Sequence, residues 1–144
     1  MKRLSYLPLV LLILLLLPGV SPAQSVQGYI DQGITNSQAG HYDQALQAFD
    51  QALKLKPNDP ALITYKGIVY YAKGNNAKAL QLFNEAIKLN PNFARAYYQR
   101  GMVYQSQGKF KQAVPELVKA KQLGYGVDPD FINLMKKRAA EQRE

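Results

Sequence analysis

A period of 34 residues runs through most of this 144-residue chain. The segments 26–59, 60–93 and 94–127 align with one another without a gap, and small residues recur at fixed positions in each. The recurring columns are Gly33, Gly67 and Gly101; Gly40, Gly74 and Gly108; Ala45, Ala79 and Ala113; and Ala52, Ala86 and Ala120. A fixed period of this length is typical of a solenoid built from stacked units.

Each unit has the pattern of a helical hairpin. Two stretches of helical periodicity are separated by Gly40, Gly74 or Gly108, where a chain can leave a helix with a positive φ at little cost. In the second stretch, apolar residues recur at intervals of three and four, which gives one apolar stripe per helix. The pattern predicts an all-α fold, an α-solenoid of three helical hairpins.

These columns resemble the tetratricopeptide repeat, whose pattern places a large residue, Gly, Tyr, Ala, an aromatic residue, Ala and Pro at fixed offsets. The second segment matches it with Ile63, Gly67, Tyr70, Ala79, Phe83, Ala86 and Pro91. The third segment departs from it with Leu117 and with Tyr125 in the proline column. The resemblance covers residues 26–127, with 128–144 expected to form a capping helix. It implies a right-handed superhelix whose first helices line a groove that binds segments of other proteins, although a fold alone does not specify a function.

Capping residues mark the expected helix starts. Asp59 and Asp128 each precede a proline and are expected to cap a helix, and Asn92 is expected to cap the helix between them. Pro115 falls inside the second helix of the third unit, where it should remove one backbone hydrogen bond and bend the helix.

Residues 1–23 have the pattern of an export signal. Lys2 and Arg3 precede an apolar run, and Ala23 ends a small-residue motif, so cleavage is expected between Ala23 and Gln24, giving a periplasmic or secreted protein. The alternative is an uncleaved membrane anchor formed by residues 4–20, which at 17 residues is at the short limit for spanning a bilayer.

The resemblance also assigns a partner-binding wall to the first helix of each unit. The expected groove residues are Gln27, Ile30, Ile34, Thr64, Ile68, Tyr71, Arg95, Tyr98 and Met102, with Gln38 and Gln105 near the edge. This mostly apolar wall suggests an extended or helical peptide held by apolar anchors, with Arg95 available to a carboxylate. In a short stack the same side chains could instead only cover one another.

One type of ligand is not expected. Relatives that grip the acidic C-terminus of cytosolic chaperones use a clamp of Lys and Asn on this wall, whereas this chain has Ile30 and Ile34 there. An export signal also makes a cytosolic chaperone an unexpected partner.

The sequence favours a non-enzyme without cofactor or metal. His41 is the only histidine and falls in the turn of the first hairpin, and there is no cysteine. No pair of acidic residues has a spacing that suggests acid–base or metal chemistry.

Loss of residues 1–23 would leave a formal charge of about +6, with lysines concentrated near the C-terminal end. This basic end could contact an acidic protein, a membrane or an anionic envelope polymer, and export makes nucleic acid an unexpected partner. Two functions stay open, with the oligomeric state undetermined. The first is an exported module that binds a partner protein in its groove, and the second is a structural component that joins an envelope complex through its stack ends or convex face.

Overall fold

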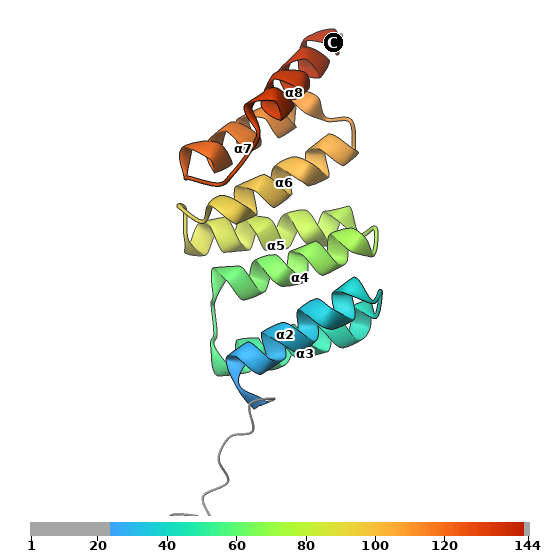
Figure 1. The fold of residues 1–144 in the computed structure, drawn as a ribbon, viewed down its shortest axis with the longest axis vertical. Helices are drawn as coiled ribbons and strands as arrows, with labels where there is room; N and C mark the ends of the chain where they lie inside the picture. Colours follow the sequence, from blue (N-terminus) through green and yellow to red (C-terminus); the bar gives the residue numbers. More distant parts are fainter. Residues whose placement is uncertain (1–23, 143–144) are drawn as a thin grey trace, which may run out of the picture.

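The computed structural model describes residues 24–142, so the expected export signal at 1–23 lies outside the described residues. Within 24–142 the chain forms seven helices and no strand (Figure 1). The helices are α2 (Val26–Gln38), α3 (Tyr42–Leu55), α4 (Pro60–Ala72), α5 (Asn76–Leu89), α6 (Ala94–Ser106), α7 (Phe110–Gln122) and α8 (Pro129–Glu141). The predicted all-α fold is confirmed.

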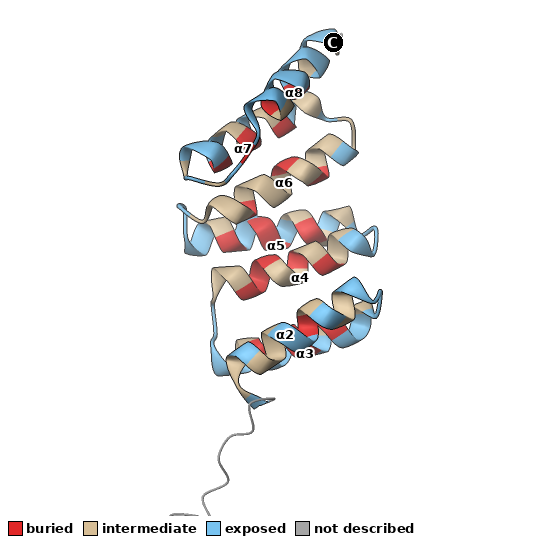
Figure 2. Cartoon of the chain, viewed as in Figure 1, coloured by how far each residue is buried: buried red, intermediate tan, exposed pale blue. Residues whose placement is uncertain are grey.

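The helices pack as a stack of hairpins. The closest pairs are α2 with α3, α4 with α5 and α6 with α7, and the stack continues through α3 against α4 and α5 against α6. Figure 1 shows the hairpins rising one above another, with α8 resting on α7 at the far end. Buried residues gather where neighbouring helices face each other (Figure 2).

Glycine allows each hairpin to close tightly. A Cβ on Gly33 would lie 2.5 Å from Cε1 of Phe49, and a Cβ on Gly67 would lie 2.5 Å from Cε1 of Phe83. Both rings are buried, with 1% and 0% of their surface exposed. At Gly101 the same distance, to the side chain of Leu117, is 3.1 Å. The glycine column therefore exists because a side chain from the second helix occupies the space that a Cβ would need.

The predicted turn glycines have the expected backbone. Gly40, Gly74 and Gly108 have φ values of 78°, 80° and 71°. The third hairpin has Tyr125 in place of the repeat's proline, and it ends in another glycine with a positive φ, Gly124, at 88°.

Two of the three predicted N-cap residues are confirmed. Asp59 accepts hydrogen bonds from the backbone N–H groups of Ala61 and Leu62, and Asp128 accepts one from Asp130. The prediction for Asn92 is wrong, because α6 begins at Ala94 and its N-cap is Phe93, whose side chain packs against the buried Ile63, Leu82, Ala86 and Ala96. A partly buried aromatic ring therefore stands where a polar cap was expected.

Pro115 lies inside α7, which runs from Phe110 to Gln122 without a break. At the end of the stack, α8 buries Ile132 and Met135 against the third hairpin.

The cap of α4 also predicts a pH dependence of stability. Burial raises the pKa of the Asp59 carboxyl, but hydrogen bonds from Lys56 and from the backbone of Leu62 and Ala61 outweigh burial and lower it. A lowered folded-state pKa stabilises the fold above the unfolded value of about 3.9, and this stabilisation is lost as the pH falls through the folded-state pKa. Asp59→Ala should therefore reduce the free energy of unfolding by about 1 kcal/mol at neutral pH, measured by urea denaturation.

The matched control is Asp59→Asn, which keeps a cap acceptor without the charge. The cost of Asp59→Ala should shrink when the titration is repeated at about pH 2.5. An equal cost at both pH values would show that the charge of Asp59 contributes nothing.

Candidate functional site

The first helices of the three hairpins meet around a small hollow. Ile34 from α2, Ile68 from α4 and Arg95 from α6 line it, and its volume is about 220 Å³. We call it the inner hollow. Its other lining residues are Ser37, Gln38, Phe49, Tyr65 and Val69. Three of the expected groove residues, together with the edge residue Gln38, therefore come together here.

Arg95 is held in place by aromatic contacts. Its guanidinium carbon lies 4.7 Å from the centroid of the Tyr65 ring, and its Nη1 donates a hydrogen bond to Tyr65 Oη at 3.2 Å. Tyr65 in turn stacks on Phe49, with ring centroids 5.3 Å apart. Nε of Arg95 is buried without a hydrogen-bond partner among the described residues. The inner hollow thus combines apolar side walls with one oriented positive charge.

Two further groove residues line a separate hollow. Tyr98 and Met102 from α6 face Gly126, Val127, Asp128 and Phe131, around a volume of about 270 Å³. The Tyr98 ring packs on Tyr125, with centroids 4.6 Å apart. The expected wall is therefore divided between two hollows.

Four expected groove residues line neither hollow. The prediction that Thr64 lines the groove is wrong, because its side chain is 0% exposed and its hydroxyl donates a hydrogen bond to the backbone carbonyl of Pro60 at 2.7 Å. A side chain without exposed surface cannot contact a partner. Gln27 is exposed and donates a hydrogen bond to Asp31. Ile30 and Tyr71 are half-buried and pack against core residues.

Sequence reasoning missed Tyr65, which shapes the inner hollow. The same column holds Asp31 and Gln99 in the other units, so its composition is that of a solvent-facing position. The sequence does contain one signal for this contact, because Tyr65 and Arg95 lie in the first helices of consecutive units.

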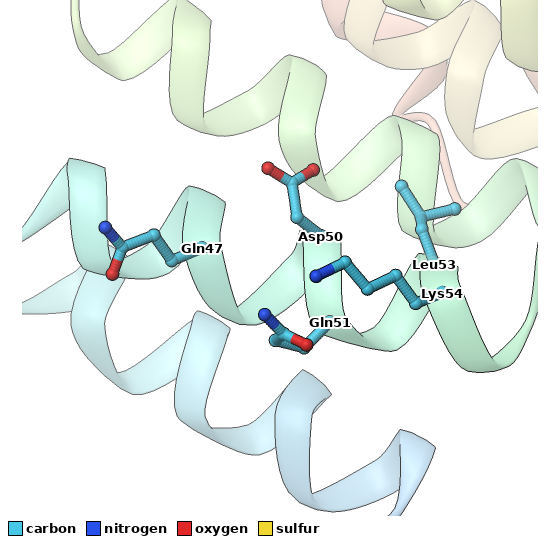
Figure 3. A pocket seen from close by; sticks show the side chains of 5 residues that line it. All are labelled: Gln47, Asp50, Gln51, Leu53 and Lys54. Atoms are coloured by element: carbon cyan, nitrogen blue, oxygen red, sulfur yellow. The ribbon is translucent and has the colours of Figure 1, made fainter.

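A larger and more open hollow, of about 500 Å³, lies along α3 (Figure 3). All five of its lining side chains, Gln47, Asp50, Gln51, Leu53 and Lys54, come from that one helix. Asp50 already accepts a hydrogen bond from Lys66 of α4 at 2.6 Å. This surface contains no expected groove residue and serves as a control.

The described residues give no metal-binding cluster of three or more His, Cys, Asp or Glu side chains. His41 is exposed and precedes α3 without a side-chain capping bond. Within 24–142, every helix is too short or too polar to cross a membrane.

Comparison with protein-family models identifies the repeat. A model described as TPR repeat matches residues 38–74 and 67–108, and one described as tetratricopeptide repeat matches residues 94–123. This chain belongs to the tetratricopeptide repeat family. The resemblance inferred from the glycine and alanine columns is confirmed. A comparison with curated protein sequences gave no match.

Solved tetratricopeptide repeat domains have the same fold. The first such domain of human RPAP3 gives a TM-score of 0.72 at 20% identity, covering 84% of this chain and 96% of that chain. The first domain of Spaghetti (RPAP3), bound to the HSP90 peptide SRMEEVD, gives 0.69 at 22% identity, with 83% and 94% covered. The TPR2B domain of yeast Sti1 in complex with pHsp70 gives 0.69 at 20% identity, with 82% and 98% covered.

Proposed function

We propose that this protein is an exported interaction module that binds a segment of a partner protein in the groove formed by α2, α4 and α6. The inner hollow is the observation that carries the proposal. It places the apolar side chains of Ile34 and Ile68 beside the guanidinium of Arg95, and these three residues come from three different helices. The proposal assigns the protein no catalytic role.

The size and chemistry of the inner hollow favour a peptide. Its volume of about 220 Å³ is smaller than the pockets that enclose small molecules, and it suits one apolar side chain of a longer chain. Arg95 would then bind a carboxylate next to that anchor. Two of the similar folds are solved with chaperone partners, which supports a peptide as the class of ligand. Because Ile30 and Ile34 replace the Lys and Asn of the chaperone clamp, we do not propose chaperone peptides as ligands of this chain.

Export rests on the composition of residues 1–23. Sequencing the N-terminus of the protein purified from cells should give Gln24 as the first residue. A protein that begins at Met1 would instead be anchored by residues 4–20, with the repeats held next to the membrane.

Acidic substitutions in the inner hollow test the binding proposal. Ile34→Asp combined with Ile68→Asp should reduce partner capture from envelope extract about tenfold or more, because a carboxylate would have to be buried against the apolar anchor. Capture is measured by quantitative mass spectrometry of a pull-down.

The matched control, Gln47→Asp with Gln51→Asp, adds the same charge to the surface along α3 and should leave capture unchanged. Thermal denaturation checks that both variants are folded. Unchanged capture by a folded inner-hollow variant would contradict groove binding and favour a structural component that uses the stack ends or the convex face.

A further inference from the structure

Helix α8 has the position of the first helix of a fourth hairpin. Like α4, it begins with an Asp-Pro pair in which the aspartate is the N-cap, and it packs on the preceding hairpin. In α4, the glycine that admits the second helix, Gly67, lies eight residues after the capping Asp59. Eight residues after Asp128 stands Lys136, which is exposed, so a helix that binds α8 must lie farther from it than α5 lies from α4. Of the described helices α8 is the last, and the side turned away from α7 is largely exposed (Figure 2).

A cleft of about 440 Å³ lies between α7 and α8. Its apolar part comes from Val118, Pro129 and Ile132, of which Ile132 is only 5% exposed. Two exposed lysines, Lys121 from α7 and Lys136 from α8, line it together with Gln122 and Asn133. This α7–α8 cleft shares no residue with the inner hollow.

The lysines of the cleft have no acidic partner at ion-pairing distance within residues 24–142. The same holds for Lys119, Lys137 and Arg138 nearby along the two helices. Of the acidic side chains at this end, Glu116 is bound by Arg100, Asp128 and Asp130 lie at the start of α8, and Glu141 is the last residue of α8. The rim of the cleft therefore carries two lysines without an ion-pair partner beside an apolar surface.

We propose that the α7–α8 cleft binds an acidic amphipathic helix of a partner protein, which lies across α7 and α8 at the end of the stack. The second helices of this chain are 13 or 14 residues long, and each presents one apolar stripe to its neighbours. A partner helix would place its stripe on Val118 and Ile132 and its carboxylates against Lys121 and Lys136. A concave cleft with an apolar floor fits a helix better than it fits the broad surface of a membrane.

A peptide-binding titration tests this proposal on the purified protein. The probe is a fluorescent synthetic helix of 14 residues, the length of α5, with a leucine stripe flanked by glutamates. A second probe has the same stripe with lysines in place of the glutamates. Fluorescence anisotropy should show binding of the acidic probe only. Lys121→Glu with Lys136→Glu should weaken that binding about tenfold or more, and added salt should weaken it in the parent protein.

Two control variants separate the cleft from other surfaces. Lys109→Glu with Lys111→Glu changes the charge at the start of α7 outside the cleft, and it should alter affinity less than about threefold by screened electrostatics alone. The inner-hollow variant, Ile34→Asp with Ile68→Asp, should bind the acidic probe normally, so failure of the groove proposal would not affect this result.

Amide chemical shifts give a second measurement that does not depend on variants. The acidic probe should shift the signals of Val118, Ile132 and Asn133. Equal binding of the two probes, equal weakening by the two lysine variants, or shifts confined to other residues would overturn the proposal. Binding of phosphatidylglycerol vesicles through Lys121 and Lys136 without binding of the acidic probe would overturn it in favour of a membrane surface.

Discussion

Gly67→Ala is expected to lower the free energy of unfolding by about 2 kcal/mol, although alanine is the better helix former. The added Cβ would lie 2.5 Å from Cε1 and 2.9 Å from Cδ1 of the Phe83 ring. Phe83 is 0% exposed, so the ring cannot move into solvent without opening the contact between α4 and α5. Overpacking outweighs the gain in helix propensity of about 1 kcal/mol. Urea denaturation of the parent and the variant measures the difference.

The third hairpin provides the matched control. At Gly101 an added Cβ would lie 3.1 Å from Cδ2 and Cγ of Leu117 and 3.2 Å from Cβ of Glu116, so these neighbours need to shift by only a few tenths of an ångström. Gly101→Ala should therefore cost less than about 1 kcal/mol. Phe83→Leu copies this arrangement in the second hairpin, so Gly67→Ala should cost less in that background. Equal costs for Gly67→Ala in both backgrounds would show that the ring is not the reason for the glycine.

Arg100→Met is expected to lower the free energy of unfolding by about 2 kcal/mol. Arg100 joins three helices: its Nε and Nη2 donate to Glu116 of α7 at 3.0 and 2.8 Å, and its Nη1 donates to Asn84 of α5 at 2.6 Å. The side chains of Arg100 and Glu116 are only 18% and 16% exposed. Removing Arg100 leaves a largely buried carboxylate without its partner, which costs more than removing both charges. Urea denaturation at neutral pH measures the change.

Two variants control for the loss of packing and of surface charge. Arg100→Met with Glu116→Met should be more stable than Arg100→Met alone, because no unpaired charge remains. Lys66→Met breaks the more exposed pair with Asp50 and should cost less than about 1 kcal/mol. A cost for Lys66→Met as large as that for Arg100→Met would contradict the role assigned to burial.

The repeat can be predicted from the sequence because its glycines are required by close packing and by backbone conformation within each hairpin. Gly67 must admit the ring of Phe83, and Gly74 must adopt a positive φ, so both positions accept few other residues. Asp59 likewise satisfies backbone N–H groups that any helix start leaves free. These constraints act within one hairpin and are therefore visible as a period.

The groove is harder to predict because it depends on how neighbouring hairpins rotate against one another. Thr64 lies on the first helix of its unit as expected, yet it is completely buried. Tyr65, the next residue, lines the inner hollow and holds Arg95 of the following unit. A shift of one residue along a helix turns the side chain by about 100°, so small differences in helix rotation decide which residue reaches the groove. At Asn92 the missing information was equally non-local, since the N-cap is Phe93, whose partly buried ring packs against the second hairpin.

Site-specific crosslinking tests the central claim most directly. A photoreactive residue introduced in place of Gln38, an exposed residue that lines the inner hollow, should crosslink the partner protein in intact cells. The same residue in place of Gln51, on the surface along α3, should give no such product. A partner crosslinked from position 51 and not from position 38 would contradict binding in the groove.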